Sequence, residues 1–217
     1  DDEGFMLWSK EQHAILSGPD SNADSIRFHT LKTIDAEQQN WQVGFGHRRL
    51  SIIDLSPAGH QPMVYKHLTI TYNGEVYNYI ELREELIATG HTFKTHADTE
   101  VILHAWAEWG RACLEKFNGM FAFSMLDGEQ DRVYLVRDRF GIKPLYYTDQ
   151  NQYFAAGSEV KQLRVLPAYK FELHKEVALE YLIDGRLDHR KETFEHGIVQ
   201  LLPGHVLEYN LSDTTST

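Results

Sequence analysis

The sequence places one arginine in an extended, partly apolar setting where it could bind an anion. Arg49 closes the run VGFGHRR and is followed by the apolar residues Leu50 and Ile52. A half-buried guanidinium needs an anionic partner, and its planar fork matches a carboxylate through two hydrogen bonds. That carboxylate could belong to an internal salt bridge or to a ligand, and Arg49 alone leaves both alternatives open.

The dipeptide Asn73-Gly74 could supply two neutral hydrogen-bond donors at one point. It ends the strand-like run LTITYNGE, where Asn-Gly is a common signal for a type I′ turn. A helix-forming segment follows directly with no returning strand, so a plain hairpin is disfavoured. The alternative is an oxyanion hole, in which the Asn73 amide and the Gly74 N–H stabilise a developing negative charge. Glycine would permit the close backbone approach.

Two acidic residues complete the set of side chains that could do chemistry. Asp98 stands at the start of a predicted helix, where an aspartate commonly caps the free N–H groups. Glu75 follows Gly74 and could be an ordinary surface residue in a turn. Taken singly, each therefore has a structural explanation.

The elements that must position these residues form clusters of helices and runs of strands. Apolar residues at helical spacing predict helices over 76–90, 98–110 and 174–185. Alternating, β-branched or aromatic runs predict strands at 43–49, 68–75, 92–96, 120–127, 131–138, 144–148, 152–157, 198–201 and 205–211. Residues 16–40 are polar and rich in turn formers, which predicts an inserted loop. This order favours an α+β fold with antiparallel sheets over a doubly wound one.

Composition excludes several classes of partner. The chain carries 32 acidic and 21 basic residues, a net charge of −11, whereas nucleic acids and anionic membranes reward a basic surface. We find no apolar run long enough to span a bilayer and no signal peptide at the start. Cys113 is the single cysteine, so no internal disulfide can form, and we expect a cytoplasmic protein.

Six motifs carry a resemblance to a known family. In order and spacing they are GHRRLSIIDLSPAGHQPM, YNGEVYNYIELREEL, HADTEVILHAW, FNGMFAFSMLD, RDRFGIKPLYY and AAGSEVKQL. The chain from about residue 43 to 211 resembles the glutaminase domain of glutamine-hydrolysing asparagine synthetases. These domains are class II glutamine amidotransferases within the N-terminal nucleophile hydrolase superfamily.

The resemblance implies a fold and a domain organisation. We expect a four-layer αββα sandwich of two antiparallel sheets, with its first strand missing from the printed sequence. Residues 1–211 would form the glutamine amidotransferase domain, with 16–40 as an inserted loop. Residues 212–217 would begin a linker to an ATP-dependent synthetase domain.

The resemblance also assigns roles to the residues singled out above. Arg49 would bind the α-carboxylate of L-glutamine and Asp98 would hold its α-ammonium. Glu75 would help to bind the polar end groups or the side-chain amide. Asn73 and the Gly74 N–H would form the oxyanion hole. The substrate-binding set that the resemblance implies is Arg49, Leu50, Ile52, Asn73, Gly74, Glu75 and Asp98.

The implied activity is hydrolysis of glutamine to glutamate and ammonia. The family passes the ammonia to a C-terminal synthetase domain, which uses ATP and magnesium to activate a carboxylate such as aspartate. No cofactor is expected in the glutaminase domain itself. The partners implied are L-glutamine and the synthetase domain, a homodimer stays an alternative, and neither nucleic acid nor membrane is expected.

One departure from the family concerns the nucleophile, which in the family is a cysteine at the mature N-terminus. The printed sequence begins at Asp1 and lacks that cysteine, so we expect the chain to be inactive alone. It would be either part of a longer enzyme or an inactive scaffold that docks on a synthetase. Cys113, placed just after a predicted helix, is expected to be a packed residue.

Two further polar groups have ordinary interpretations. His96, Glu100 and His104 share a spacing of four, but His96 precedes the predicted helix, so no metal site is expected. Arg137, Asp138 and Arg139 alternate in sign at a strand end, which predicts that they pair internally.

Overall fold

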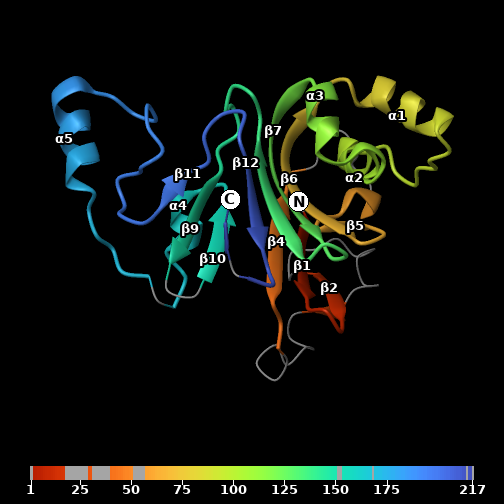
Figure 1. The fold of residues 1–217 in the computed structure, drawn as a ribbon, viewed down its shortest axis with the longest axis horizontal. Helices are drawn as coiled ribbons and strands as arrows, with labels where there is room; N and C mark the ends of the chain where they lie inside the picture. Colours follow the sequence, from red (N-terminus) through yellow and green to blue (C-terminus); the bar gives the residue numbers. More distant parts are fainter. Residues whose placement is uncertain are drawn as a thin grey trace.

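The protein is an α+β sandwich built on one large antiparallel sheet, as Figure 1 shows. The computed structural model describes residues 2–17, 29–30, 40–50, 57–150, 153–167, 169–213 and 215–216. The six-stranded sheet has the order β13-β12-β8-β7-β6-β5, all antiparallel. Its strands are β5 (Met63–Tyr65), β6 (Leu68–Val76), β7 (Gly119–Asp127), β8 (Arg132–Arg137), β12 (Val206–Asn210) and β13 (Thr215–Ser216).

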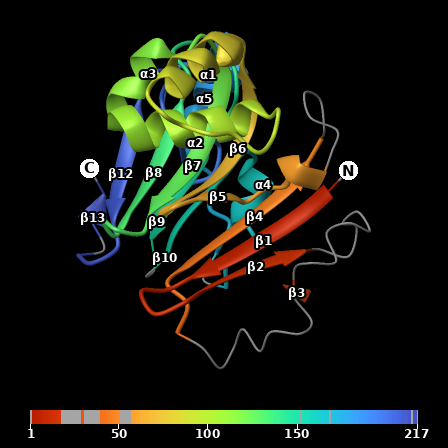
Figure 2. The same cartoon turned by 90° about the vertical axis from the view of Figure 1, so that its right-hand side faces the viewer.

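Two smaller sheets lie on one side of this large sheet (Figures 1 and 2). The order of the first is β3-β2-β1-β4 and that of the second is β10-β9-β11. Their strands are β1 (Asp2–Trp8), β2 (His13–Ser17), β3 (His29–Thr30), β4 (Val43–Arg49), β9 (Tyr146–Gln150), β10 (Tyr153–Gly157) and β11 (Val199–Gln200). The pair β2–β3 is parallel, which departs from the purely antiparallel expectation.

Helices cover the opposite side of the large sheet. Its outer face is packed by α1 (Tyr79–Ala88), α2 (Asp98–Trp109) and α3 (Cys113–Lys116), as both ribbon views show. The short helix α4 (Val160–Leu163) and the projecting helix α5 (Lys175–Asp184) accompany the sheet of β9 to β11. Short 3₁₀ turns occur at η3 (Pro57–Gly59) and η4 (Gly110–Ala112).

Two hydrophobic cores separate the layers. On β6, the alternate residues Leu68, Ile70 and Tyr72 are buried against the helices, because successive side chains of a strand point to opposite faces. The second core lies between the large sheet and the smaller ones, and contains Met6 and Leu145. The predicted α+β fold with antiparallel sheets is thus confirmed.

Local expectations hold for most elements and fail for two, the strand at 92–96 and the capping role of Asp98. Residues 92–96 are not a strand. The N-cap of α2 is Ala97 without a side-chain hydrogen bond, so the capping role predicted for Asp98 is wrong. Asn73 and Gly74 lie inside β6 and pair with β7, which rules out the type I′ turn. Most of the predicted loop 16–40 lies outside the described residues.

Arg137, Asp138 and Arg139, which the sequence predicts to pair internally, each form hydrogen bonds with backbone groups of the protein. The Asp138 carboxylate is buried and accepts N–H bonds from Phe121, Phe140, Ile142 and Lys143, at 3.0–3.2 Å. Backbone carbonyls accept hydrogen bonds from both arginines. Buried charges need several hydrogen bonds, and here the backbone of a tight loop supplies them.

Cys113 is fully buried in the core beneath the helices. Burial raises the pKa of its thiol to about 12, so the thiol stays protonated near neutral pH. The expectation that it is a packed residue is confirmed.

A buried histidine should make the protein less stable in acid. His104 stacks between Tyr65 and Phe93, with ring centroids at 3.8 and 4.4 Å, and its Nδ1 lies 2.8 Å from Nδ1 of His91. Burial lowers the pKa of His104 from 6.5 to about 4. The unfolded chain therefore binds this proton more readily than the folded protein does, and stability falls as the pH drops from about 6.5 towards 4. The loss is on the order of 3 kcal/mol.

Urea unfolding at a series of pH values checks this expectation. In the variant His104→Gln, the free energy of unfolding should no longer show the decrease between pH 6.5 and 4 that His104 causes, and unfolding should stay cooperative. A variant curve parallel to that of the wild type would contradict the assignment.

Candidate functional site

The carboxylate of Asp98 reaches from the helical layer to the end of β6. Its Oδ2 accepts a hydrogen bond from the Tyr72 hydroxyl at 2.7 Å and from the Val76 N–H at 3.1 Å. Burial is the main cause that raises the pKa of Asp98 above its usual 3.8, and these two donors oppose it. Burial also raises the pKa of Tyr72, which keeps its hydroxyl protonated as a donor. A nearby cation would stabilise the ionised form of a buried carboxylate that accepts hydrogen bonds only from neutral donors.

A short segment connects Asp98 with Arg49 on the other side of β6. The Gln61 side chain accepts a hydrogen bond from the Tyr72 N–H at 2.7 Å and donates one to the Thr99 hydroxyl at 3.5 Å. Two residues earlier, Gly59 lies against the guanidinium of Arg49, because a Cβ placed on it would be 2.3 Å from Nη2. The segment 59–61 therefore contacts both the guanidinium of Arg49 and Thr99, the residue after Asp98.

Arg49 points into the space between the sheets. It ends β4, where alternate residues from Val43 onward face the large sheet, and only 9% of its surface is exposed. Asp2 of β1 is its partner across the small sheet. The next residue, Leu50, is 74% exposed, and Ile52 lies outside the described residues, so the structure does not place it.

The oxyanion-hole residues predicted from the sequence sit at the same end of β6. Strand alternation turns the side chains of Asn73 and Glu75 to the face opposite Tyr72, which is the face towards β4 and Arg49. Gly74 lies against β7, where a Cβ would be 2.2 Å from the Met120 carbonyl oxygen. Its φ of +153° also favours glycine.

Asn73, Glu75 and Asp98 lie around the same end of β6 but approach it from two sides. Arg49, Asn73 and Glu75 face the space between the sheets, whereas Asp98 comes from the helical layer and meets the backbone at Val76. Chemically, this places two carboxylates and a side-chain amide around one end of a strand, with a buried guanidinium on β4. Such a set suits a zwitterionic ligand, in which opposite charges meet separate partners.

Three positioning residues were missed by the sequence-based reasoning. Tyr72 holds Asp98, Gln61 connects the layers, and Gly59 makes room for Arg49. Alternation along LTITYNGE could have placed Tyr72 on the buried face. The segment PAGHQP offered no comparable signal, because it reads as a turn.

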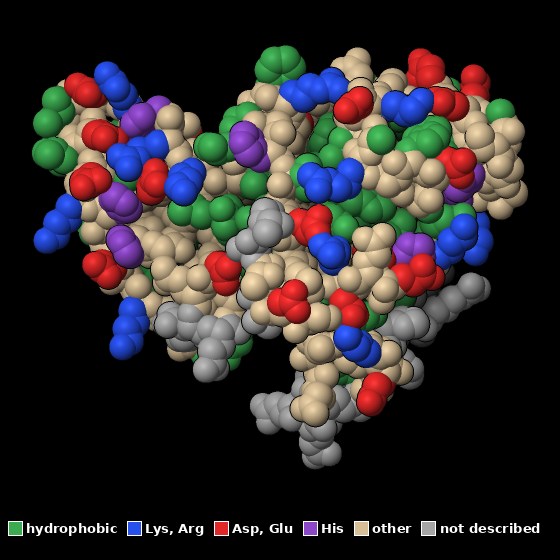
Figure 3. Space-filling model, viewed as in Figure 1, with side chains coloured by type: hydrophobic (Ala, Val, Ile, Leu, Met, Phe, Trp, Pro, Cys, Tyr) green, Lys and Arg blue, Asp and Glu red, His purple; other side chains and the backbone are tan. Residues whose placement is uncertain are grey.

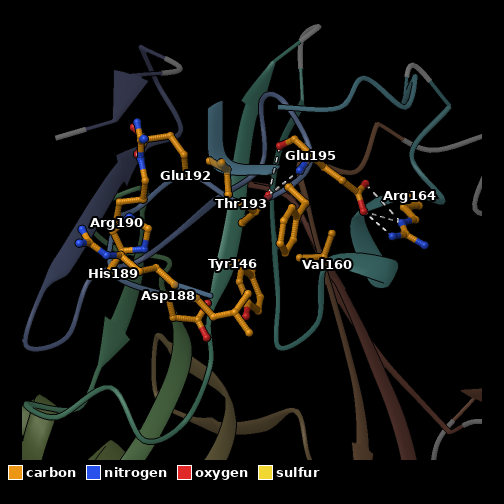
Figure 4. Close-up of a pocket in the computed structure, with 13 residues that line it drawn as sticks. Tyr146, Val160, Arg164, Asp188, His189, Arg190, Glu192, Thr193 and Glu195 are labelled. Atoms are coloured by element: carbon orange, nitrogen blue, oxygen red, sulfur yellow. Dashed lines mark hydrogen bonds and ion pairs between the residues drawn. The ribbon is translucent and has the colours of Figure 1, made fainter. Parts of the chain in front are cut away.

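A cavity elsewhere on the molecule contains none of the seven predicted residues. It has a volume of about 320 Å³ and is lined by residues from α4, α5 and the segment 186–195, as Figure 4 shows. Two ion pairs, Arg164–Glu195 and Arg190–Glu192, lie within its lining.

Tyr72→Phe should destabilise the protein, because it removes the hydroxyl that donates a hydrogen bond to Asp98. We expect a loss of about 1–3 kcal/mol, which is the usual range for a hydrogen bond to a charged group. The pKa of Asp98 should rise further, so the loss should be larger at neutral pH than in acid. Tyr134→Phe is the matched control, since its hydroxyl bonds to the neutral Gln130 amide at 3.2 Å. Urea unfolding of both variants measures the difference, and equal losses would contradict the role given to Tyr72.

Comparison with known proteins identifies what the chain is similar to. Residues 33–217 match the family described as glutamine amidotransferase domain. The chain is 42% identical over 183 residues to asparagine synthetase [glutamine-hydrolyzing] 1 of Bacillus subtilis, covering 83% of this chain and 27% of that protein. It is 38% identical over 170 residues to asparagine synthetase [glutamine-hydrolyzing] 3 of the same organism, covering 76% and 28%.

Solved structures support the fold at low sequence identity. Glutamine phosphoribosylpyrophosphate amidotransferase from B. subtilis superposes with a TM-score of 0.68 and 18% identity, over 100% of this chain and 42% of that one. The chain spans about a quarter of the length of the curated relatives it matches. Within the described part of the chain, no helix has both the length and the apolar character needed to cross a bilayer.

Proposed function

Because the chain belongs to the glutamine amidotransferase domain family, we propose that it forms the glutaminase part of an asparagine synthetase-like enzyme. In this proposal it binds L-glutamine and releases ammonia for the amidation of a carboxylate such as aspartate. Asparagine synthetases that hydrolyse glutamine are among its relatives, and they support this choice over an inactive scaffold.

The observations that carry the proposal are the buried carboxylate of Asp98 at the end of β6 and the buried guanidinium of Arg49 on β4. The buried guanidinium of Arg49 would bind the α-carboxylate through two charge-assisted hydrogen bonds. Asp98 would bind the α-ammonium, since burial raises the pKa of this carboxyl and a cation would stabilise its ionised form. Glu75, on the face of β6 towards Arg49, would help to bind the polar groups of the substrate, and Leu50 and Ile52 would border it.

The side-chain amide of glutamine would lie beside Asn73 and Gly74. Attack on this amide creates a negative oxygen, and the Asn73 amide and the Gly74 N–H would donate hydrogen bonds to it. Cys113 cannot be the nucleophile, because its thiol is buried and its pKa is raised to about 12. We assign the attack to a cysteine at the mature N-terminus of the complete protein, as the family resemblance implies.

The acceptor reaction would take place in a synthetase region outside this chain. That region would bind ATP and magnesium, activate the carboxylate and receive the ammonia. A cytoplasmic location would suit this chemistry, and the single cysteine of the chain is compatible with it.

An assay of nitrogen donors on the complete protein tests this function. With ATP, magnesium and aspartate present, glutamine should yield glutamate and asparagine in similar amounts. Ammonium salts should replace glutamine as the donor. Product from ammonium with no glutamate released from glutamine would instead identify this domain as the inactive scaffold.

A further inference from the structure

Exposed hydrophobic side chains are concentrated in one segment of the protein. Half of the large hydrophobic residues that are exposed in the described part of the chain lie between positions 165 and 187. They are Val165, Phe171, Leu173, Leu179, Tyr181, Leu182, Ile183 and Leu187. Where exposed apolar residues form a contiguous patch, they mark an interaction site more often than isolated exposed residues do.

The helix α5 presents the densest part of this surface. It projects from the flank of the molecule in Figure 1, and Val177 is its only buried residue. Leu182 and Ile183 are 79% and 71% exposed. Hydrophobic side chains accordingly gather over α5 at the left edge of Figure 3. We define the α5 surface as Leu179, Leu182, Ile183 and Leu187.

A helix that packs so little against the rest of the chain is expected to contact another surface in the complete protein. Isolated helices of this length are marginal in water, and helices in proteins gain most of their stability from packing an apolar face. Ten residues form α5, and a glycine in the left-handed conformation ends it at Gly185. The sequence therefore specifies a helix whose apolar face is not covered by the described residues.

The charged groups beside α5 already pair with one another. Glu180 bonds to Arg190 at 3.0 Å and to His189 at 2.9 Å, and Arg190 also bonds to Glu192 at 2.8 Å. Arg164 pairs with Glu195 on the other side of the adjoining cavity, as Figure 4 shows. Because these charged groups already pair with neighbouring residues, the α5 surface offers a partner mainly apolar contacts. This favours a protein surface as the occupant over a nucleotide or another small anion.

We propose that the α5 surface is the docking site of the ATP-dependent synthetase region of the same protein. The inference rests on the proposed function, which requires that region to lie close enough to receive ammonia. The relatives named above carry about three quarters of their length outside the part that this chain matches. A covalently attached region covers the helix permanently, and permanent interfaces are the ones with apolar, core-like surfaces. A second copy is the competing occupant.

The test uses the complete protein with Leu182→Glu and Ile183→Glu combined. Hydrogen exchange should show slow amides across α5 in the wild type and faster exchange in this double variant. Asparagine formed per glutamine hydrolysed should fall about tenfold or more, since two charges placed in an apolar interface weaken docking. Glutamine hydrolysis and ammonia-dependent synthesis should each stay close to the wild-type rate.

The matched control is Ile80→Glu with Ile87→Glu, two positions on α1 that are each 54% exposed. This variant should leave exchange at α5 and the product ratio unchanged. Unprotected α5 amides in the wild type would overturn the proposal. So would a double variant that dissociates an oligomer during sedimentation while coupling stays intact, because that result assigns the surface to a second copy. If the wild type hydrolyses no glutamine, the proposed function fails, yet hydrogen exchange still decides the docking.

Discussion

Gly74→Ala is expected to abolish most glutamine hydrolysis and to destabilise the protein by about 3 kcal/mol. The added Cβ would sit 2.2 Å from the Met120 carbonyl oxygen and 2.6 Å from the Phe121 Cα. Both neighbours are backbone atoms of β7, so β6 and β7 must separate to admit a methyl group. The same shift would move the proposed oxyanion donors, and loss of one such donor lowers kcat by about 10²- to 10³-fold.

Gly90→Ala is the control for this variant. Gly90 also has a positive φ, +102°, but a Cβ there would meet nothing within 4 Å. Gly90→Ala therefore measures the free-energy cost of placing a non-glycine residue at a positive φ without a steric clash. This cost should be about 1 kcal/mol. Urea unfolding and kcat for glutamine would be compared in the complete protein. If Gly74→Ala loses no more stability than Gly90→Ala, the close approach of β7 is not what requires glycine.

Arg49→Ala is expected to lower kcat/KM for glutamine about 10- to 150-fold while sparing ammonia as the nitrogen donor. The range follows from about 1.5–3 kcal/mol for a charge-assisted bidentate contact. Arg48→Ala is the control, because Arg48 is the adjacent arginine, its side chain is 69% exposed and it pairs with Glu3. It should change neither activity. An equal loss with both nitrogen donors after Arg49→Ala would count against the binding role.

Gly59→Ala tests the same contact without removing the arginine. Its Cβ would be 2.3 Å from the Arg49 Nη2, which is the far end of a flexible side chain. The arginine side chain can move aside, so the free energy of unfolding should change little. Glutamine binding should weaken, as it is expected to do in Arg49→Ala. Unchanged kinetics would mean that the position of the guanidinium at Gly59 is not the one that binds substrate.

The sequence predicted the sheet and helix content because these depend on residues that are close in the chain. The alternation of LTITYNGE matches β6, and the helical spacing over 76–90 matches α1. Of the apolar residues that gave this spacing, Leu86 is buried, whereas Ile80 and Ile87 are each 54% exposed. The order of the six motifs identified the family, which the comparisons confirm over residues 33–217. The site assignments that came with the resemblance stay predictions.

Partners that are far apart in the chain could not be predicted in this way. Asp98 looked like a helix cap, yet its carboxylate bonds to Tyr72 and Val76, 26 and 22 residues away. The capping interpretation considered only neighbouring N–H groups, and a buried hydroxyl on the adjoining sheet competed successfully for the same oxygen. The positioning role of Gln61 could not be predicted for the same reason, since its hydrogen-bond partners lie on β6 and α2.

The sequence by itself therefore determined most of the segments that become strands and helices, and the family to which they belong. Only the tertiary structure decided that Arg49 lies against Gly59, that Asp98 meets Tyr72, and that α5 carries its apolar face outward. Periodicity is set by the local geometry of the backbone, and it can be read over one or two turns or a few residues of strand. The partner of a polar or apolar side chain depends on which distant surfaces pack together, and that is fixed only when the layers assemble.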